Sequence, residues 1–232
     1  MSLKSQSILK KILSRFRRFI FTDYREHMLS KTICHEIEKL EKIKKKKKIK
    51  ILDFGSGYNP IVINEIIKTL SIKYRNTEFS AYCYDFYEKS ELKIMNNNSN
   101  IKFLNIKNLS NSKNAKFNFC LLVDVLHHIG LENSKKIFRI INKLKKKSKF
   151  LIIKDHFQYG FFSNMALILM DFIGNYGDDV KIPKTYFSIN TFESFLKKSK
   201  LKEIKRISNK KYYKWYWFYF NSKKLQFLSV LK

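Results

Sequence analysis

The segment ILDFGSG, residues 51–57, decides the fold of this chain, because it ends an apolar run on two glycines. The run predicts a buried strand, and residues 61–73 beyond it have the spacing of a helix. Gly55 and Gly57 lack a Cβ, so the backbone there can turn sharply and approach a ligand closely. Pro60 suits the first turn of the helix, where no N–H is needed. A strand, a glycine turn and a helix in this order predict a ligand site beyond the carboxyl end of the strand.

Outward from this segment, strands and helices alternate. Each predicted strand is a nearly continuous apolar run, which indicates a mostly parallel sheet covered by helices on both faces. The length of 232 residues suits one such domain with a short extension. The predicted strands are 48–57, 78–86, 101–106, 117–126, 149–157, 201–208 and 225–232, and the helices after the first strand are 61–73, 132–146, 163–173 and 190–199.

A carboxylate, Asp85, ends the second predicted strand. It can accept hydrogen bonds from both hydroxyls of a ribose. The alternative is a tight turn and a strand-end acid that bind no ligand. A dinucleotide site of the Gly-x-Gly-x-x-Gly type would need glycine where Pro60 stands, which disfavours a nicotinamide or flavin enzyme.

Several segments together resemble the class I S-adenosylmethionine (SAM)-dependent methyltransferases. ILDFGSG resembles their motif I, and Asp85 matches their ribose-binding acid. Asn105 lies where the family places a residue that reads the adenine amino group. VDVLHHI, residues 123–129, resembles the strand-4 motif of small-molecule and lipid or quinone methyltransferases. The match covers residues 48–156 well and the rest of the chain mainly in the order of its elements.

The resemblance implies a Rossmann-like α/β fold, with a seven-stranded, mostly parallel sheet, helices on both faces and an antiparallel last strand. It also implies SAM as the cofactor. Asn59 stands for a frequent third glycine and Asn105 for a common aspartate, but Asn tolerates left-handed backbone and its carbonyl still accepts a hydrogen bond. The expected cofactor-binding residues are Asp53, Gly55, Ser56, Gly57, Asp85, Phe86, Asn105, Asp124 and Val125.

Candidate bases for methyl transfer gather at the ends of the fourth and fifth predicted strands. Three of the five histidines of the chain lie there. A neutral imidazole can take a proton from a hydroxyl or amine near pH 7. The alternative is a structural role in capping or packing, and the sequence does not choose between His128 and His156. No zinc-ligand spacing occurs, so no metal is expected. The candidate catalytic residues are His127, His128, Asp155 and His156.

Residues 1–47 are expected to form an N-terminal amphipathic helical extension, with helices at 1–21 and 24–43, and residues 48–232 the methyltransferase domain. Within that domain, the aromatic segment 157–187 is expected to be a lid over the acceptor, and a helix packed on the sheet is the alternative. A second aromatic cluster, 212–220, fits the core, a dimer interface, a membrane surface or single-stranded nucleic acid.

The net charge of +29 suggests an anionic partner, but lysine is spread over the whole chain, as a genome rich in A and T would produce. The resemblance of the strand-4 segment implies a small or lipid-like methyl acceptor, and the basic helix at 1–21 is expected to make peripheral contact with an anionic membrane. Methylation of RNA or protein through the basic surface, and a degenerate SAM-fold protein without catalysis, are the alternatives. Three cysteines without a CxxC pair indicate buried, reduced thiols and a cytoplasmic protein. The oligomeric state stays open.

Overall fold

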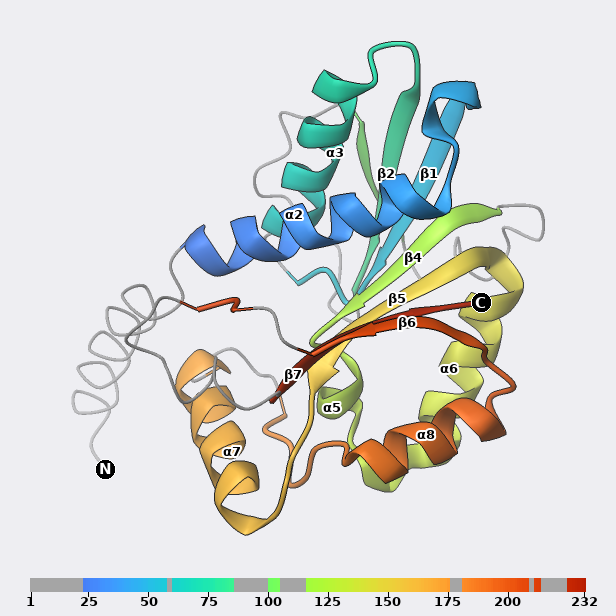
Figure 1. Cartoon of the computed structure of the whole chain (residues 1–232). Helices are drawn as coiled ribbons and strands as arrows, with labels where there is room; N and C mark the ends of the chain where they lie inside the picture. Colours follow the sequence, from blue (N-terminus) through green and yellow to red (C-terminus); the bar gives the residue numbers. More distant parts are fainter. Residues whose placement is uncertain are drawn as a thin grey trace.

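The computed structural model describes residues 23–57, 60–85, 100–104, 116–175, 181–208, 211–213 and 225–232. These residues form a seven-stranded sheet in the order β3-β2-β1-β4-β5-β7-β6, with helices on both faces (Figure 1). The predicted helix at 1–21, Phe86, Asn105 and most of the aromatic cluster 212–220 lie outside the described residues.

Six strands of the sheet point in the same direction, and β7, which runs antiparallel to both of its neighbours, is the exception. This confirms the predicted mostly parallel sheet with an antiparallel last strand. The strands are β1 (Lys48–Phe54), β2 (Glu78–Tyr84), β3 (Ile101–Leu104), β4 (Phe117–Val123), β5 (Ser148–His156), β6 (Glu203–Ile207) and β7 (Gln226–Leu231).

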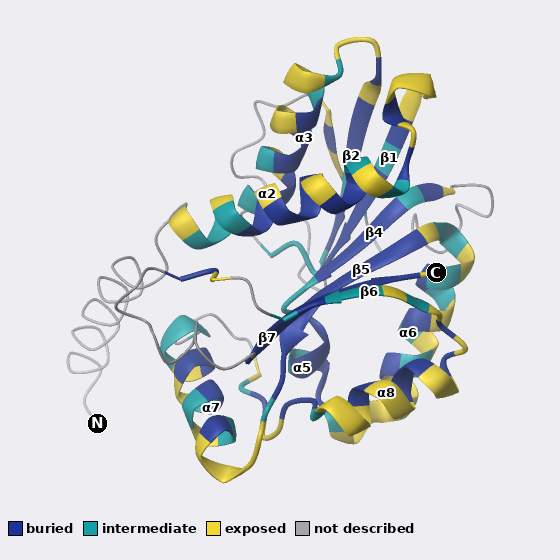
Figure 2. Ribbon diagram, viewed as in Figure 1, coloured by how far each residue is buried: buried dark blue, intermediate teal, exposed yellow. Residues whose placement is uncertain are grey.

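Two apolar cores lie against the two faces of the sheet. Figure 2 shows the central strands of the sheet largely buried between the helices, whereas the edge strand β6 is mostly intermediate or exposed. One core takes in α2, α3 and α7, and the other takes in α5, α6 and α8. These helices are α2 (Asp23–Leu40), α3 (Ile61–Lys73), α5 (Leu126–Ile129), α6 (Ser134–Lys147), α7 (Phe161–Asn175) and α8 (Ile189–Lys198), and short 3₁₀ turns occupy Ile43–Lys45 and Leu131–Asn133.

The predicted elements differ from the observed ones mainly at their ends. The fourth strand ends at Val123 and not at residue 126, because Asp124 has a φ of 55° and turns the chain into α5. Helix α2 ends at Leu40, and a 3₁₀ turn replaces part of the lysine-rich linker. The three cysteines are free and buried, as predicted.

Helix α2 belongs to the core of the domain. Leu29, Ile33 and Ile37 are fully buried and pack in the same cluster as the residues of β1 and α3. Among the described residues, no helix is both long and apolar enough to cross a bilayer.

Candidate active site

The turn after β1 is tied to the end of β2 by backbone and side-chain hydrogen bonds. The N–H of Gly55 donates to the carbonyl of Tyr84 at 2.7 Å. The N–H of Gly57 donates to Oδ2 of Asp85 at 2.6 Å. The predicted ribose-binding acid therefore lies beside the glycine turn, as the parallel pairing of β1 and β2 requires.

The two glycines of this turn have different reasons to be glycine. Both have positive φ values, 84° for Gly55 and 66° for Gly57. A Cβ on Gly55 would lie 2.5 Å from Cγ2 of Val125, whereas one on Gly57 would meet no atom within 4 Å among the described residues beyond its chain neighbours. The space beside Gly55 is thus filled by the protein itself. The open space lies at Gly57, next to Asp85.

Asp53, at the end of β1, is a buried carboxyl group. Burial, and then the nearby charge of Asp85, raise the pKa of Asp53 to about 7. A carboxyl group with this pKa carries its proton in a large fraction of molecules at neutral pH, so it can donate a hydrogen bond.

At the carboxyl end of β4, Asp124 binds two cationic side chains. Its Oδ1 accepts a hydrogen bond from Nζ of the fully buried Lys154 at 2.6 Å, and its Oδ2 accepts one from the guanidinium of Arg25 on α2. Burial alone would raise the pKa of Asp124, but Lys154 and Arg25 hold it well below its usual range. Asp124 is therefore a carboxylate that joins α2 to the ends of β4 and β5.

His127 lies between two carboxylates in the interior. Its Nδ1 is 2.6 Å from Oδ1 of Asp155, and its Nε2 is 3.3 Å from Oδ2 of Asp171 on α7. Burial opposes the charged imidazolium, but Asp155 and Asp171 outweigh it and raise the pKa of His127 to about 10. Tyr186 donates its hydroxyl hydrogen to Asp171 at 2.5 Å. His127 is thus a charged group that links β5 to α7.

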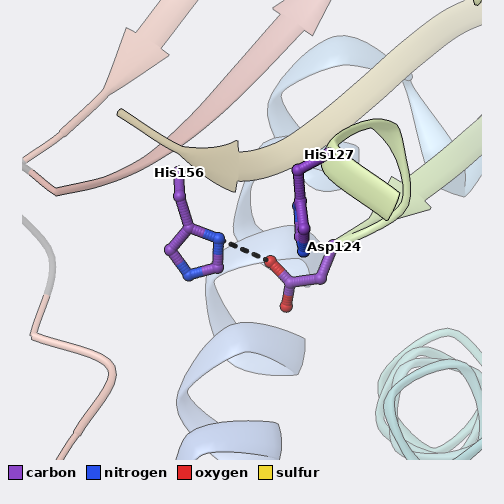
Figure 3. A group of neighbouring side chains, drawn as sticks. All are labelled: Asp124, His127 and His156. Atoms are coloured by element: carbon purple, nitrogen blue, oxygen red, sulfur yellow. Dashed lines mark ion pairs between the residues drawn. The ribbon is translucent and has the colours of Figure 1, made fainter. Parts of the chain in front are cut away.

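His156 and His128 lie on either side of His127 and have lowered pKa values. Figure 3 shows His156 beside Asp124 and His127 at the ends of β4 and β5, with Nδ1 of His156 3.6 Å from Oδ1 of Asp124. Burial and the charge of Lys154 lower the pKa of His156. His128 is less buried, and its Nδ1 lies 3.1 Å from the carbonyl of Lys181. Burial and the charge of His127 lower its pKa.

A family model described as "Methyltransferase domain" matches residues 24–229 of this chain. The chain belongs to this family. No curated protein sequence matches it significantly. The predicted membership of the SAM-dependent methyltransferases is thereby confirmed.

Solved structures share the fold of this methyltransferase at low identity. An O-methyltransferase family 2 protein from Planctomyces limnophilus, in complex with apigenin, is 14% identical with a TM-score of 0.51, over 79% of this chain and 49% of its own. LepI in complex with SAM is 12% identical with a TM-score of 0.55, over 86% and 46%. A SAM-dependent methyltransferase from Archaeoglobus fulgidus is 13% identical with a TM-score of 0.50, over 88% and 94%. The chain therefore spans about half the length of the first two.

The residues of the glycine turn are of the kinds that SAM binding requires. Gly57 leaves open space where a side chain would stand, and the carboxylate of Asp85 lies at its edge. Ser56 lies in the same turn, and the side chain of Val125 lies against Gly55. These positions fit a ribose that needs hydrogen-bond acceptors and close backbone approach.

A metal ion fits this part of the methyltransferase poorly. Two groups of side chains bring donor atoms within 4.8 Å of one another, Asp124 with His127 and His156, and His127 with His128 and Asp171. In the first group, the ammonium of Lys154 already binds Asp124. In the second group, the raised pKa of His127 means that its ring carries a proton at neutral pH. A protonated imidazole has no lone pair to offer a metal ion.

Three residues that contact Asp124 or His127 were not among the sequence candidates: Arg25, Lys154 and Asp171. Asp171 carries a signal, since it is the only charged residue of the otherwise apolar helix α7. Lys154 carries a weaker one, since it follows the apolar run Phe150–Ile153 directly and adjoins Asp155. A charged residue at such a position is buried only with a partner. Arg25 carries no such signal, because the chain has many cations near its N-terminus.

Proposed function

We propose that this methyltransferase transfers the methyl group of SAM to a small or lipid-like acceptor at the carboxyl ends of β4 and β5, with His128 as general base. The single observation that carries the base assignment is the 3.1 Å contact between Nδ1 of His128 and the carbonyl of Lys181. A carbonyl only accepts, so Nδ1 carries the hydrogen and Nε2 keeps its lone pair.

The other two histidines are less suited to act as the base. His127 is held as an imidazolium between Asp155 and Asp171, so it has no lone pair at neutral pH. Nε2 of His156 lies 3.4 Å from the ammonium of Lys154, which donates to the lone pair that a base would use. The half-buried His128, with its lowered pKa, is neutral near pH 7.

SAM, when bound, supplies a methyl group that is already activated on a sulfonium. The protein therefore has to orient the acceptor and remove its proton. Nε2 of His128 would take the proton of an acceptor hydroxyl or amine. SAM would supply the methyl group through cleavage of its carbon–sulfur bond, with S-adenosylhomocysteine as the leaving group. The charged pair of His127 and Asp155 holds the neighbouring segment in place.

Support for a small acceptor comes from the strand-4 segment and from a structural neighbour that binds apigenin, a small phenolic molecule. This chain matches only 49% of the length of that neighbour. The neighbour's substrate is therefore a guide only to the chemical class of the acceptor. A small phenol with an ionisable hydroxyl is the first acceptor to try.

The test measures release of S-adenosylhomocysteine from SAM with a panel of small phenols. His128→Gln should lower turnover by about 100-fold, the usual contribution of a positioned base. His35→Gln, which changes an exposed histidine of α2, is the matched control and should behave as wild type. Equal turnover of both variants would remove His128 as the base, and calorimetry that detects no binding of SAM would show a degenerate module.

A further inference from the structure

Helix α7 presents an apolar face to the outside of the molecule. Phe161 is 73% exposed, Phe162 83%, Met165 48% and Leu169 58%. These positions lie on one side of the helix, because residues three and four apart share a face. Figure 2 shows exposed residues along α7 away from the sheet, while its inner side is buried. Six of the ten exposed large apolar side chains in the described part of the chain lie between Tyr159 and Phe172.

The sequence of this region lacks the cations that cover the rest of the protein. Lysine and arginine account for 48 of the 232 residues, yet none lies between residues 155 and 180. Helices α2, α3, α6 and α8 all carry lysines, and α7 carries none. An exposed helix face that stays apolar in so basic a chain indicates contact with an apolar surface.

Charge decides among the surfaces that could cover this face. Two copies of a chain with a net charge of +29 repel each other. Nucleic acid is bound through cations that neutralise phosphates, and this face has none. An anionic bilayer fits both features, because its interface accepts aromatic rings and its headgroups attract the surrounding lysines.

We propose that the outer face of α7 docks on an anionic membrane surface, with Phe161 and Phe162 entering the interface. The two rings contact each other edge to face at 5.6 Å and lie at the amino end of the helix. The exposed Lys184 lies alongside, since its carbonyl accepts a hydrogen bond from Asn164 of α7 at 3.2 Å. Lys184 follows the cation-free region and is placed to meet headgroups, whereas the ammonium of Lys181 pairs with Glu132.

The test is sedimentation of the full-length protein with vesicles, which does not require methyl transfer. Vesicles of phosphatidylcholine and phosphatidylglycerol in equal parts should pellet the wild type, and salt should weaken the binding. The double variant Phe161→Ser, Phe162→Ser should have a vesicle partition constant about tenfold lower than that of the wild type. Ile72→Ser with Ile204→Ser removes two exposed apolar side chains elsewhere and should bind as wild type. Equal binding of the two double variants overturns the proposal.

A spin label at Phe162→Cys identifies the occupant, since the three native cysteines are buried. The label should be mobile in solution and become restricted and shielded from water when vesicles are added. A label that is already restricted at low protein concentration would show that the chain covers its own helix. One that becomes restricted as protein concentration rises would show a second copy, and either result overturns membrane docking.

Discussion

Nδ1 of His127 lies 2.6 Å from Oδ1 of Asp155, and both side chains are almost completely buried. The pair makes the stability of the fold depend on pH. The pKa of His127 rises from 6.5 to about 10 on folding. Its contribution is therefore fully present below about pH 6.5 and is lost as the pH rises through 10.

Asp155→Asn should lower the free energy of unfolding by about 3–5 kcal/mol at pH 7, because it leaves a buried imidazolium with one carboxylate fewer. It should also make the decline in stability between pH 6.5 and 10 shallower, because the pKa of His127 is raised less. Urea denaturation over this range measures both effects. Glu132→Gln, which breaks an exposed pair with Lys181, is the control and should change neither.

Asp85→Ala should weaken SAM binding by about 1–3 kcal/mol, the scale of losing charge-assisted hydrogen bonds. The carboxylate lies at the glycine turn and accepts the N–H of Gly57. Calorimetry with SAM measures the loss. Glu78→Ala, an exposed acid at the other end of β2, is the control. Affinity that is the same in both variants would place the ribose elsewhere.

Gly55→Val should unfold or strongly destabilise the protein as well as abolish SAM binding, because a Cβ there meets Val125 at 2.5 Å. Gly57→Ala should cost about 1–2 kcal/mol of stability, the penalty of a left-handed residue with a Cβ, and should weaken SAM binding beyond that. Thermal melting beside calorimetry separates the two effects. Normal SAM binding by Gly57→Ala would show that the open space at Gly57 does not receive the cofactor.

The sequence predicted the fold and the glycine turn well because both follow from local patterns. Apolar runs set the strands, and strand ends placed Asp85 beside Gly57. The contact of Arg25 with Asp124 joins residues 99 positions apart, and only the packing of α2 on the sheet brings them together. No local pattern carries such information.

Helix α7 shows a second limit of sequence reasoning. Its residues are apolar on nearly every side, so periodicity does not show which face is inside. Phe161 and Phe162 are exposed, whereas Leu167 and Met170 of the same helix are buried in the core. The lid predicted at residues 157–187 stays a prediction. The part of it that could cover an acceptor is the inner side of α7, where Asp171 lies.

Asp171→Asn should loosen α7 from the ends of the strands. Asp171 binds both His127 and Tyr186, and the loss of its charge weakens two buried contacts. A loss of about 2 kcal/mol in local stability makes amide hydrogen exchange roughly 30-fold faster where opening is local. Mass-spectrometric exchange should show this change in α7 and leave α3 unaffected. Tyr186→Phe, which removes one of the two contacts, should have a smaller effect in the same direction. Uniform acceleration over α3 and α7 would mean that Asp171 supports the whole fold, and the lid assignment would then lose its physical basis.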